Sequence, residues 1–286
     1  MKTNRSNWGL LASGFTLLEM LTVIAIIGLM AALIGPNLGN FKPNVVASAT
    51  QQLLTDVSRA RLLATSQHTT VYMVFVPPSF WNDPVFQAGF NTSTDYANAY
   101  PLLDKQLTGY NFVSLRSIGD QPGRHTPHYL SSWKTMPDGT YIHPTKYNNF
   151  YTNYAYYDLY TNNITAPGVN VFATYAPFSN TVSVPFPTEL TPAVNSQYTT
   201  LPCIAFNYLG QLVNPVTGNL AAGDELIPIA KGSVMYKRDP VTRTNMPPGV
   251  PNVLESPPGA SLTNSFSVVQ IERLTGRARV VRQEVK

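Results

Sequence analysis

A twenty-residue apolar run at positions 15–34, interrupted by one carboxylate, Glu19, constrains this chain more than any other feature. As an α-helix with a rise of about 1.5 Å per residue, such a run reaches roughly 30 Å, which matches the hydrocarbon core of a bilayer. An acid inside a membrane span is costly and indicates a function. The run therefore predicts a membrane-spanning helix over residues 15–34 in which Glu19 has a specific role.

The residues before the run form a short leader, 1–14, that carries Lys2 and Arg5 but no acid. A secretory signal places its small-residue cleavage site after the apolar stretch, whereas here the small residue, Gly14, precedes it. Only Lys42 follows the run closely. The positive-inside rule therefore predicts a cytoplasmic leader and an extracytoplasmic location for everything after the span.

The segment from Gly14 through Phe15 to Glu19, followed by the apolar run and Pro36, resembles the prepilin family, which comprises type IV pilins and the pseudopilins of type II secretion. The resemblance implies that a prepilin peptidase cleaves between Gly14 and Phe15 and N-methylates Phe15. It also implies that Glu19 pairs with the new amine of a neighbouring subunit during assembly. A second role for Glu19, recognition by the peptidase or by another inner-membrane protein, stays open.

The same resemblance implies the partners and the location of the protein. The partners are the prepilin peptidase/methyltransferase, other pilins or pseudopilins, an inner-membrane assembly platform, and the lipid bilayer before assembly. The location is the inner membrane, with a single pass, and a fibre after assembly. The pieces SRARLLATSQHTTVYMVF, CIAFNYLGQL and VVQIERLTGRARV further resemble the minor pseudopilins related to the secretion-system H component and to FimT-like pilins.

Two helical segments are expected at the N-terminus, separated by a Gly/Pro-rich break at 35–44. Pro36 lacks the N–H that would bond to the carbonyl of Ala32, so it predicts a break or kink. Residues 45–68 then read as an amphipathic helix. Its apolar stripe is formed by Val46, Leu53, Val57, Ala60 and Ala64, with Ala49 or Thr50 in the missing turn, and Gln52, Asp56, Arg59 and Arg61 are placed largely off it.

The pattern after this helix is typical of β-strands. A strand is expected at 70–76, and two hairpins are expected around Gly210 and Gly276, the second pairing 266–271 with 277–282. The expected fold class is therefore α+β. A long N-terminal helix, with a transmembrane half, the break and an amphipathic half, would pack on a C-terminal antiparallel β-sheet domain. That β-rich, extracytoplasmic domain would cover 69–286 and contain a large β-rich insertion at about 77–201.

The predicted insertion is rich in tyrosine, with seven of these residues at positions 141–160. One interpretation is a ligand face, because tyrosines and amides stack on and hydrogen-bond to carbohydrate or partner protein. The favoured interpretation is a β subdomain whose tyrosines cover its own core.

Other function classes find little support in the sequence. The 19 basic and 15 acidic residues are too balanced to indicate nucleic-acid binding. Cys203, the only cysteine, reads as a buried and inert thiol, and His125 and His128 make only a weak zinc signal. Motifs of hydrolases, metalloproteases and nucleotide-binding enzymes are missing, so we expect no enzyme, catalytic residue, cofactor or metal.

We therefore expect a structural subunit, a minor pilin or pseudopilin of a protein-secretion pseudopilus or a pilus-like fibre. The alternative is a single-span, membrane-anchored surface binding protein or adhesin that uses the Tyr/Asn-rich insertion. The sequence leaves open whether the machine serves secretion, adhesion, motility or DNA uptake.

Overall fold

The structure is a computed structural model, and it describes residues 16–38, 45–78, 80, 99–116, 120, 125–144, 146–147, 177–186, 197–242, 251–256, 258 and 266–281. The chain divides into two compact units, Met1–Asn44 and Val45–Lys286.

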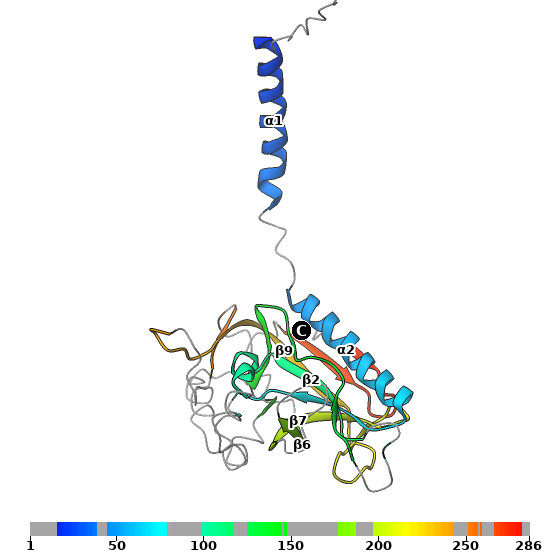
Figure 1. Ribbon diagram of the computed structural model, residues 1–286. Helices are drawn as coiled ribbons and strands as arrows, with labels where there is room; N and C mark the ends of the chain where they lie inside the picture. Colours follow the sequence, from blue (N-terminus) through cyan, green and yellow to red (C-terminus); the bar gives the residue numbers. More distant parts are fainter. Residues whose placement is uncertain are drawn as a thin grey trace, which may run out of the picture. The chain divides into compact units, whose positions relative to one another are not determined.

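The first unit contains the helix α1, Leu17–Leu38 (Figure 1). Thr16 caps its start, because the Thr16 Oγ1 atom accepts a hydrogen bond of 3.2 Å from the backbone N–H of Glu19. The side chains at positions 16–30 are exposed in the structure. A search of the described residues found no helix that combines the length and the apolar character needed to cross a membrane.

The second unit is built around the helix α2, Val45–Gln67, and two antiparallel sheets (Figure 1). The helix contacts strands of both sheets, which explains why it carries a continuous buried stripe. The buried residues of α2 are Ala49, Thr50, Leu53, Asp56, Val57, Ala60 and Ala64.

The first sheet has the strand order β3-β2-β1-β7-β6, with β4 paired to β2 and β8 paired to β7. Its strands are β1 (Val71–Phe75), β2 (Gly109–Ser114), β3 (His128–Tyr129), β4 (Lys134–Thr135), β6 (Thr181–Phe186), β7 (Gln197–Phe206) and β8 (Leu212–Val213). A short 3-10 helix, η2 (Tyr100–Lys105), precedes β2. The predicted strand at 70–76 is confirmed as β1.

The second sheet has the order β10-β9-β11-β12, with β5 paired to β9. Its strands are β5 (Thr140–Ile142), β9 (Glu225–Met235), β10 (Asn252–Glu255), β11 (Ser267–Ile271) and β12 (Ala278–Val281). Both predicted hairpins are confirmed, as β7–β8 and β11–β12, and both Gly210 and Gly276 adopt positive φ, of 77° and 62°. The two turns pack closely, since a Cβ atom on Gly276 would lie 2.0 Å from the Gly210 carbonyl oxygen.

Strand β1 is buried on both of its faces because apolar clusters lie on either side of the first sheet. Its alternate residues Val71, Met73 and Phe75 belong to the cluster that includes the buried stripe of α2. Tyr72 and Val74 belong to a second cluster with η2, β6 and β7. Since successive side chains of a strand point to opposite faces, a strand between two clusters reads as one continuous apolar run.

The predicted fold class was wrong in its main feature. Instead of one long N-terminal helix, the described residues form two separate helices, α1 and α2, in different units, and α2 packs on two antiparallel sheets of its own unit. Helix α1 runs through Pro36 and ends at Leu38, within the predicted break at 35–44, and α2 begins at Val45. Pro36 lies in the last turn of α1, where its missing N–H removes only one hydrogen bond. This loss does not end the helix at Pro36. Residues 39–44 lie outside the described part.

The prediction of a single C-terminal sheet with a separate insertion was also wrong. Strand β2 pairs with β1 in the first sheet, and β5 pairs with β9 in the second. Both strands lie within 77–201, so this region supplies strands to both sheets. Each is buried along its whole length, and it therefore lacks the polar alternation by which a half-exposed strand is recognised.

Candidate functional site

The residues predicted for processing and assembly fall at the start of α1. Glu19 lies in the first turn of this helix and its side chain is exposed. Gly14 and Phe15, the predicted cleavage pair, lie outside the described residues. Thr16 and Glu19 form the Thr-x-x-Glu pattern of a helix start, where the positive end of the helix dipole favours a carboxylate. The structure thus places the acid at the N-terminal end of an apolar helix.

The surface of α1 is the largest concentration of exposed apolar side chains among the described residues. They include Leu17, Leu18, Met20, Leu21, Val23, Ile24, Ile26, Ile27, Leu29 and Met30. Exposed apolar area costs about 25 cal/mol per Å² relative to burial, so a surface of this kind marks a binding face or a membrane contact. Glu19 is the one charged residue among positions 17–30.

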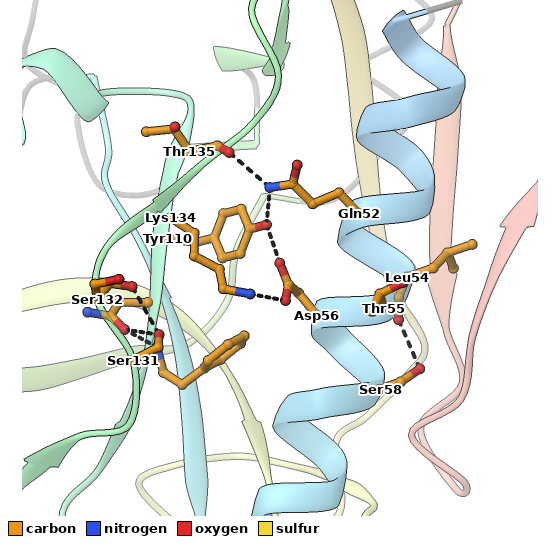
Figure 2. A network of polar contacts seen from close by, with 12 residues as sticks. Gln52, Leu54, Thr55, Asp56, Ser58, Tyr110, Ser131, Ser132, Lys134 and Thr135 are labelled. Carbon is orange, nitrogen blue, oxygen red and sulfur yellow. Dashed lines mark hydrogen bonds and ion pairs between the residues drawn. The ribbon is translucent and has the colours of Figure 1, made fainter. Parts of the chain in front are cut away.

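A polar cluster in the second unit was not predicted from the sequence (Figure 2). Asp56 of α2 is only 3% exposed, although it was predicted to lie largely off the apolar stripe. The hydroxyl of Tyr110 donates a 2.6 Å hydrogen bond to Asp56 Oδ2, and the Lys134 ammonium group pairs with Oδ1. The carboxylate therefore receives a partner on each oxygen, as a buried charge requires.

Gln52, one turn earlier on α2, extends the cluster to the strands (Figure 2). Its side-chain Nε2 donates to the Tyr110 hydroxyl oxygen at 2.8 Å and to the Thr135 carbonyl at 2.9 Å. Burial first, and then the hydrogen bond to Asp56, raise the pKa of Tyr110 well above its usual range, so Tyr110 remains a neutral donor. Because Tyr110 and Lys134 are register partners of β2 and β4, these contacts fix how α2 lies on this hairpin.

Two further buried pairs of ionisable side chains connect the predicted insertion with the second sheet. Lys146, 2% exposed, pairs with Glu225 of β9, and its ammonium group lies 4.8 Å from the centre of the Phe178 ring. Burial lowers the pKa of Lys146 and raises the pKa of Glu225, while the attraction within the pair opposes both shifts. His143 Nε2 lies 3.5 Å from Glu255 Oε1, and burial lowers the pKa of this histidine.

The other residues singled out from the sequence lie apart from these clusters. Cys203 is buried as predicted, and burial raises the pKa of its thiol. Tyr141 and Tyr147, the first two of the tyrosine-rich stretch, are core residues, and the other five lie outside the described residues. In the described part of the chain, no group of histidine, cysteine or acidic side chains has metal-binding geometry. His125 instead accepts a hydrogen bond from Arg116.

Comparisons of the chain with family models, with curated proteins and with solved structures found no match. Its function is therefore argued from its own residues.

Proposed function

We propose that this protein is a minor pilin or pseudopilin subunit that assembles through its apolar N-terminal segment into a type II secretion pseudopilus or a type IV pilus-like fibre. The observation that carries the proposal is the position of Glu19. It lies in the first turn of α1, where the exposed side chains are otherwise uncharged, and it follows Gly14 by five residues. The prepilin resemblance requires this arrangement.

Cleavage between Gly14 and Phe15 supplies the second half of the assembly contact. The new amine on Phe15 has an ordinary pKa of about 7.7–8.0 and is largely protonated near neutral pH. It would stand just before Thr16, at the positive end of its own helix, where a cation is disfavoured. The Glu19 carboxylate of a neighbouring subunit offsets this cost, and in a medium of low dielectric constant the pair is strong enough to set the register between subunits.

The apolar side chains of the 15–34 segment must be shielded from water both before and after assembly. In the proposal the inner membrane provides this shielding first, with the leader in the cytoplasm and the second unit outside. Neighbouring subunits provide it afterwards, and Gly28, beside which a Cβ atom would meet nothing within 4 Å, allows close helix approach. Repeated head-to-tail contacts of this type generate an open helical fibre.

The direct test is the mature N-terminus. Mass spectrometry of protein extracted from membranes of cells that express a prepilin peptidase should find a chain beginning at N-methylated Phe15. A Gly14→Leu variant should keep its leader, because the peptidase needs a small residue there. An intact Met1 in the parent chain, or a cut beyond Ile34, would overturn the proposal.

The role of Glu19 is tested separately. Glu19→Ala should be processed like the parent chain but should be lost from sheared fibres, whereas Glu19→Asp, which keeps the charge, should retain part of the assembly. Normal incorporation of Glu19→Ala would show that the pairing between subunits is not needed.

A membrane-anchored surface binding protein is the second candidate. A cleft at the α2–β1 connection, lined by Arg116, Tyr198 and Tyr208 among others, favours it. This candidate differs from the first at the N-terminus, since an anchor has no need of cleavage at Gly14.

A further inference from the structure

A cleft of about 560 Å³ opens at the end of the first sheet, where the chain passes from α2 into β1. A volume of this size falls in the roughly 300–1,000 Å³ range of small-molecule sites. The lining residues belong to the α2–β1 connection, β1, the end of β2, the segment before β3, β6, β7 and the β7–β8 turn. Those used below are His68, Tyr72, Arg116, His125, Tyr198 and Tyr208.

Tyr72 supplies a hydroxyl group at the wall of the cleft. Its side chain lines the cleft and is only 9% exposed. A phenolic hydroxyl both donates and accepts hydrogen bonds. It can therefore bond to a hydroxyl group of a bound molecule.

Arg116 gives the cleft a permanent positive charge. Its Nε donates a 3.0 Å hydrogen bond to His125 Nδ1, which leaves both terminal amino groups of the guanidinium for another acceptor. The same bond places the proton of a neutral His125 on Nε2 and makes that atom a donor. No acidic side chain is present among the lining residues that the structure describes. The cleft is thus suited to an anion, and the planar guanidinium is suited to a carboxylate.

Aromatic rings and hydroxyl groups supply the rest of the lining. The rings of Tyr198 and Tyr208 are about half exposed, and Thr69, Thr70 and Ser183 add hydroxyls that donate and accept. Exposed tyrosine rings provide flat apolar faces with a polar tip. A small inorganic anion has no apolar face that could pack on these rings. A sugar presents both an apolar ring face and many hydroxyls.

His68 occupies a backbone conformation that costs stability. It has φ of 49° at the C-terminus of α2, where the Thr69 N–H bonds back to the Ala64 carbonyl at 3.3 Å. Glycine is the usual residue at this helix-end position. A histidine there places an imidazole at the edge of the cleft, and strained residues of this kind cluster at binding sites.

From these observations we propose that the cleft binds an acidic saccharide, with its carboxylate on Arg116, a ring face against Tyr198 or Tyr208, and its hydroxyls on Tyr72 and His68. This binding site goes beyond the role in fibre assembly and does not depend on it.

The test is a titration of the full chain in detergent with oligogalacturonate, followed by calorimetry, beside its methyl ester as the matched neutral ligand. The acid should bind and the ester should bind at least ten times more weakly. Arg116→Gln should lower the affinity at least tenfold and Tyr72→Phe severalfold, while Arg59→Gln, on the exposed face of α2, should change nothing.

His68→Gly separates binding from folding. It relieves the backbone strain, so the melting temperature should rise while the affinity for oligogalacturonate falls severalfold. An unchanged affinity would overturn the role of His68. Equal binding of acid and ester, or equal binding of inorganic phosphate, would overturn the proposed ligand class. Tighter binding of a single-stranded oligonucleotide would assign the cleft to nucleic acid instead.

Discussion

The helices α1 and α2 have nearly the same length, 22 and 23 residues, but they differ in how far their apolar side chains are buried. The described side chains of α1 are exposed and almost all apolar. In contrast, α2 has most of its apolar residues on one stripe, and that stripe is buried against both sheets of its own unit. The apolar stripe of α2 completes the core of its unit, whereas the side chains of α1 at positions 17–30 are exposed.

The difference follows from how apolar residues are distributed around each helix. A helix that is apolar on all sides still exposes apolar surface when only one face is packed, because the remaining sides meet water. A helix with a single stripe gains its stability from packing against one layer. Helix α2 therefore belongs to the core of the second unit, whereas the role of α1 in assembly is our proposal.

The largest expected effect is on solubility. A chain of residues 45–286 keeps α2, both sheets and all the residues of the two apolar clusters. It should remain folded and stay in the aqueous fraction, whereas the full chain should require detergent. Fractionation by centrifugation and thermal unfolding of both chains would check this. Aggregation or unfolding of the shortened chain would show that the first unit contributes to the fold.

The second prediction compares leucines in different surroundings. Leu53→Ala, at a fully buried position of α2, should lower the free energy of unfolding by about 3 kcal/mol, because it leaves a cavity in the core. Leu62→Ala on the same helix, 66% exposed, should change it by less than about 0.5 kcal/mol. Urea unfolding of the 45–286 chain measures both values. Equal effects would mean that α2 is not packed as described.

Leu21→Ala extends the comparison to α1. Leu21 is 58% exposed, so its removal should leave the unfolding of the second unit unchanged. If α1 forms the core of a fibre, the same change should reduce assembly. The amount of protein in sheared fibres, relative to that of the parent chain, is the measurement.

The polar cluster under α2 gives the next smaller effect. Asp56→Ala leaves the buried Tyr110 hydroxyl without its acceptor and Lys134 without its partner, and it should cost about 2–3 kcal/mol of unfolding free energy. Asp56→Asn should cost less, since the amide oxygen still accepts the bond from Tyr110. If the two variants were equally destabilised in urea, the charge pair rather than the hydrogen bond would hold α2 in place.

Asp56 also shows where reading the sequence failed. Its spacing, three residues after Leu53 and four before Ala60, fits the buried stripe, but it was predicted to lie largely off that stripe. The partners that make burial possible, Tyr110 and Lys134, lie 54 and 78 residues away along the chain. No local pattern contains that information, so the polar cluster was not predicted.

The elements that were predicted correctly are those with strong local signals. The β-branched and aromatic run at β1 and the glycines at the two hairpin turns act within a few residues, and they gave the right strands. Strands β2 and β5 were assigned to an insertion because their place in the sheets depends on distant partners, Val71–Phe75 and β9. At α1 the start with Glu19 was readable from the sequence, while the position of the helix end was not.

The smallest effect concerns pH. Burial holds the pKa of His143 below its ordinary value of about 6.5, so the folded chain binds a proton less readily than the unfolded chain, where this value applies. The contribution of His143 to stability is therefore fully present above about pH 6.5 and is lost as the pH falls below that value. Urea unfolding of the 45–286 chain at about pH 7.5 and about pH 5.5 should show this loss.

His143→Gln is the matched variant for this measurement, because its side chain stays neutral over the same range. It should be less stable than the parent chain at the higher pH, since it repacks a fully buried site, but its stability should fall less between the two pH values. Glu255 beside His143 favours the protonated imidazole and makes the loss smaller than burial alone would cause. An identical pH dependence in both chains would mean that Glu255 cancels the cost of burying a protonated His143. The pair would then take up a proton without weakening the contact between the predicted insertion and the second sheet.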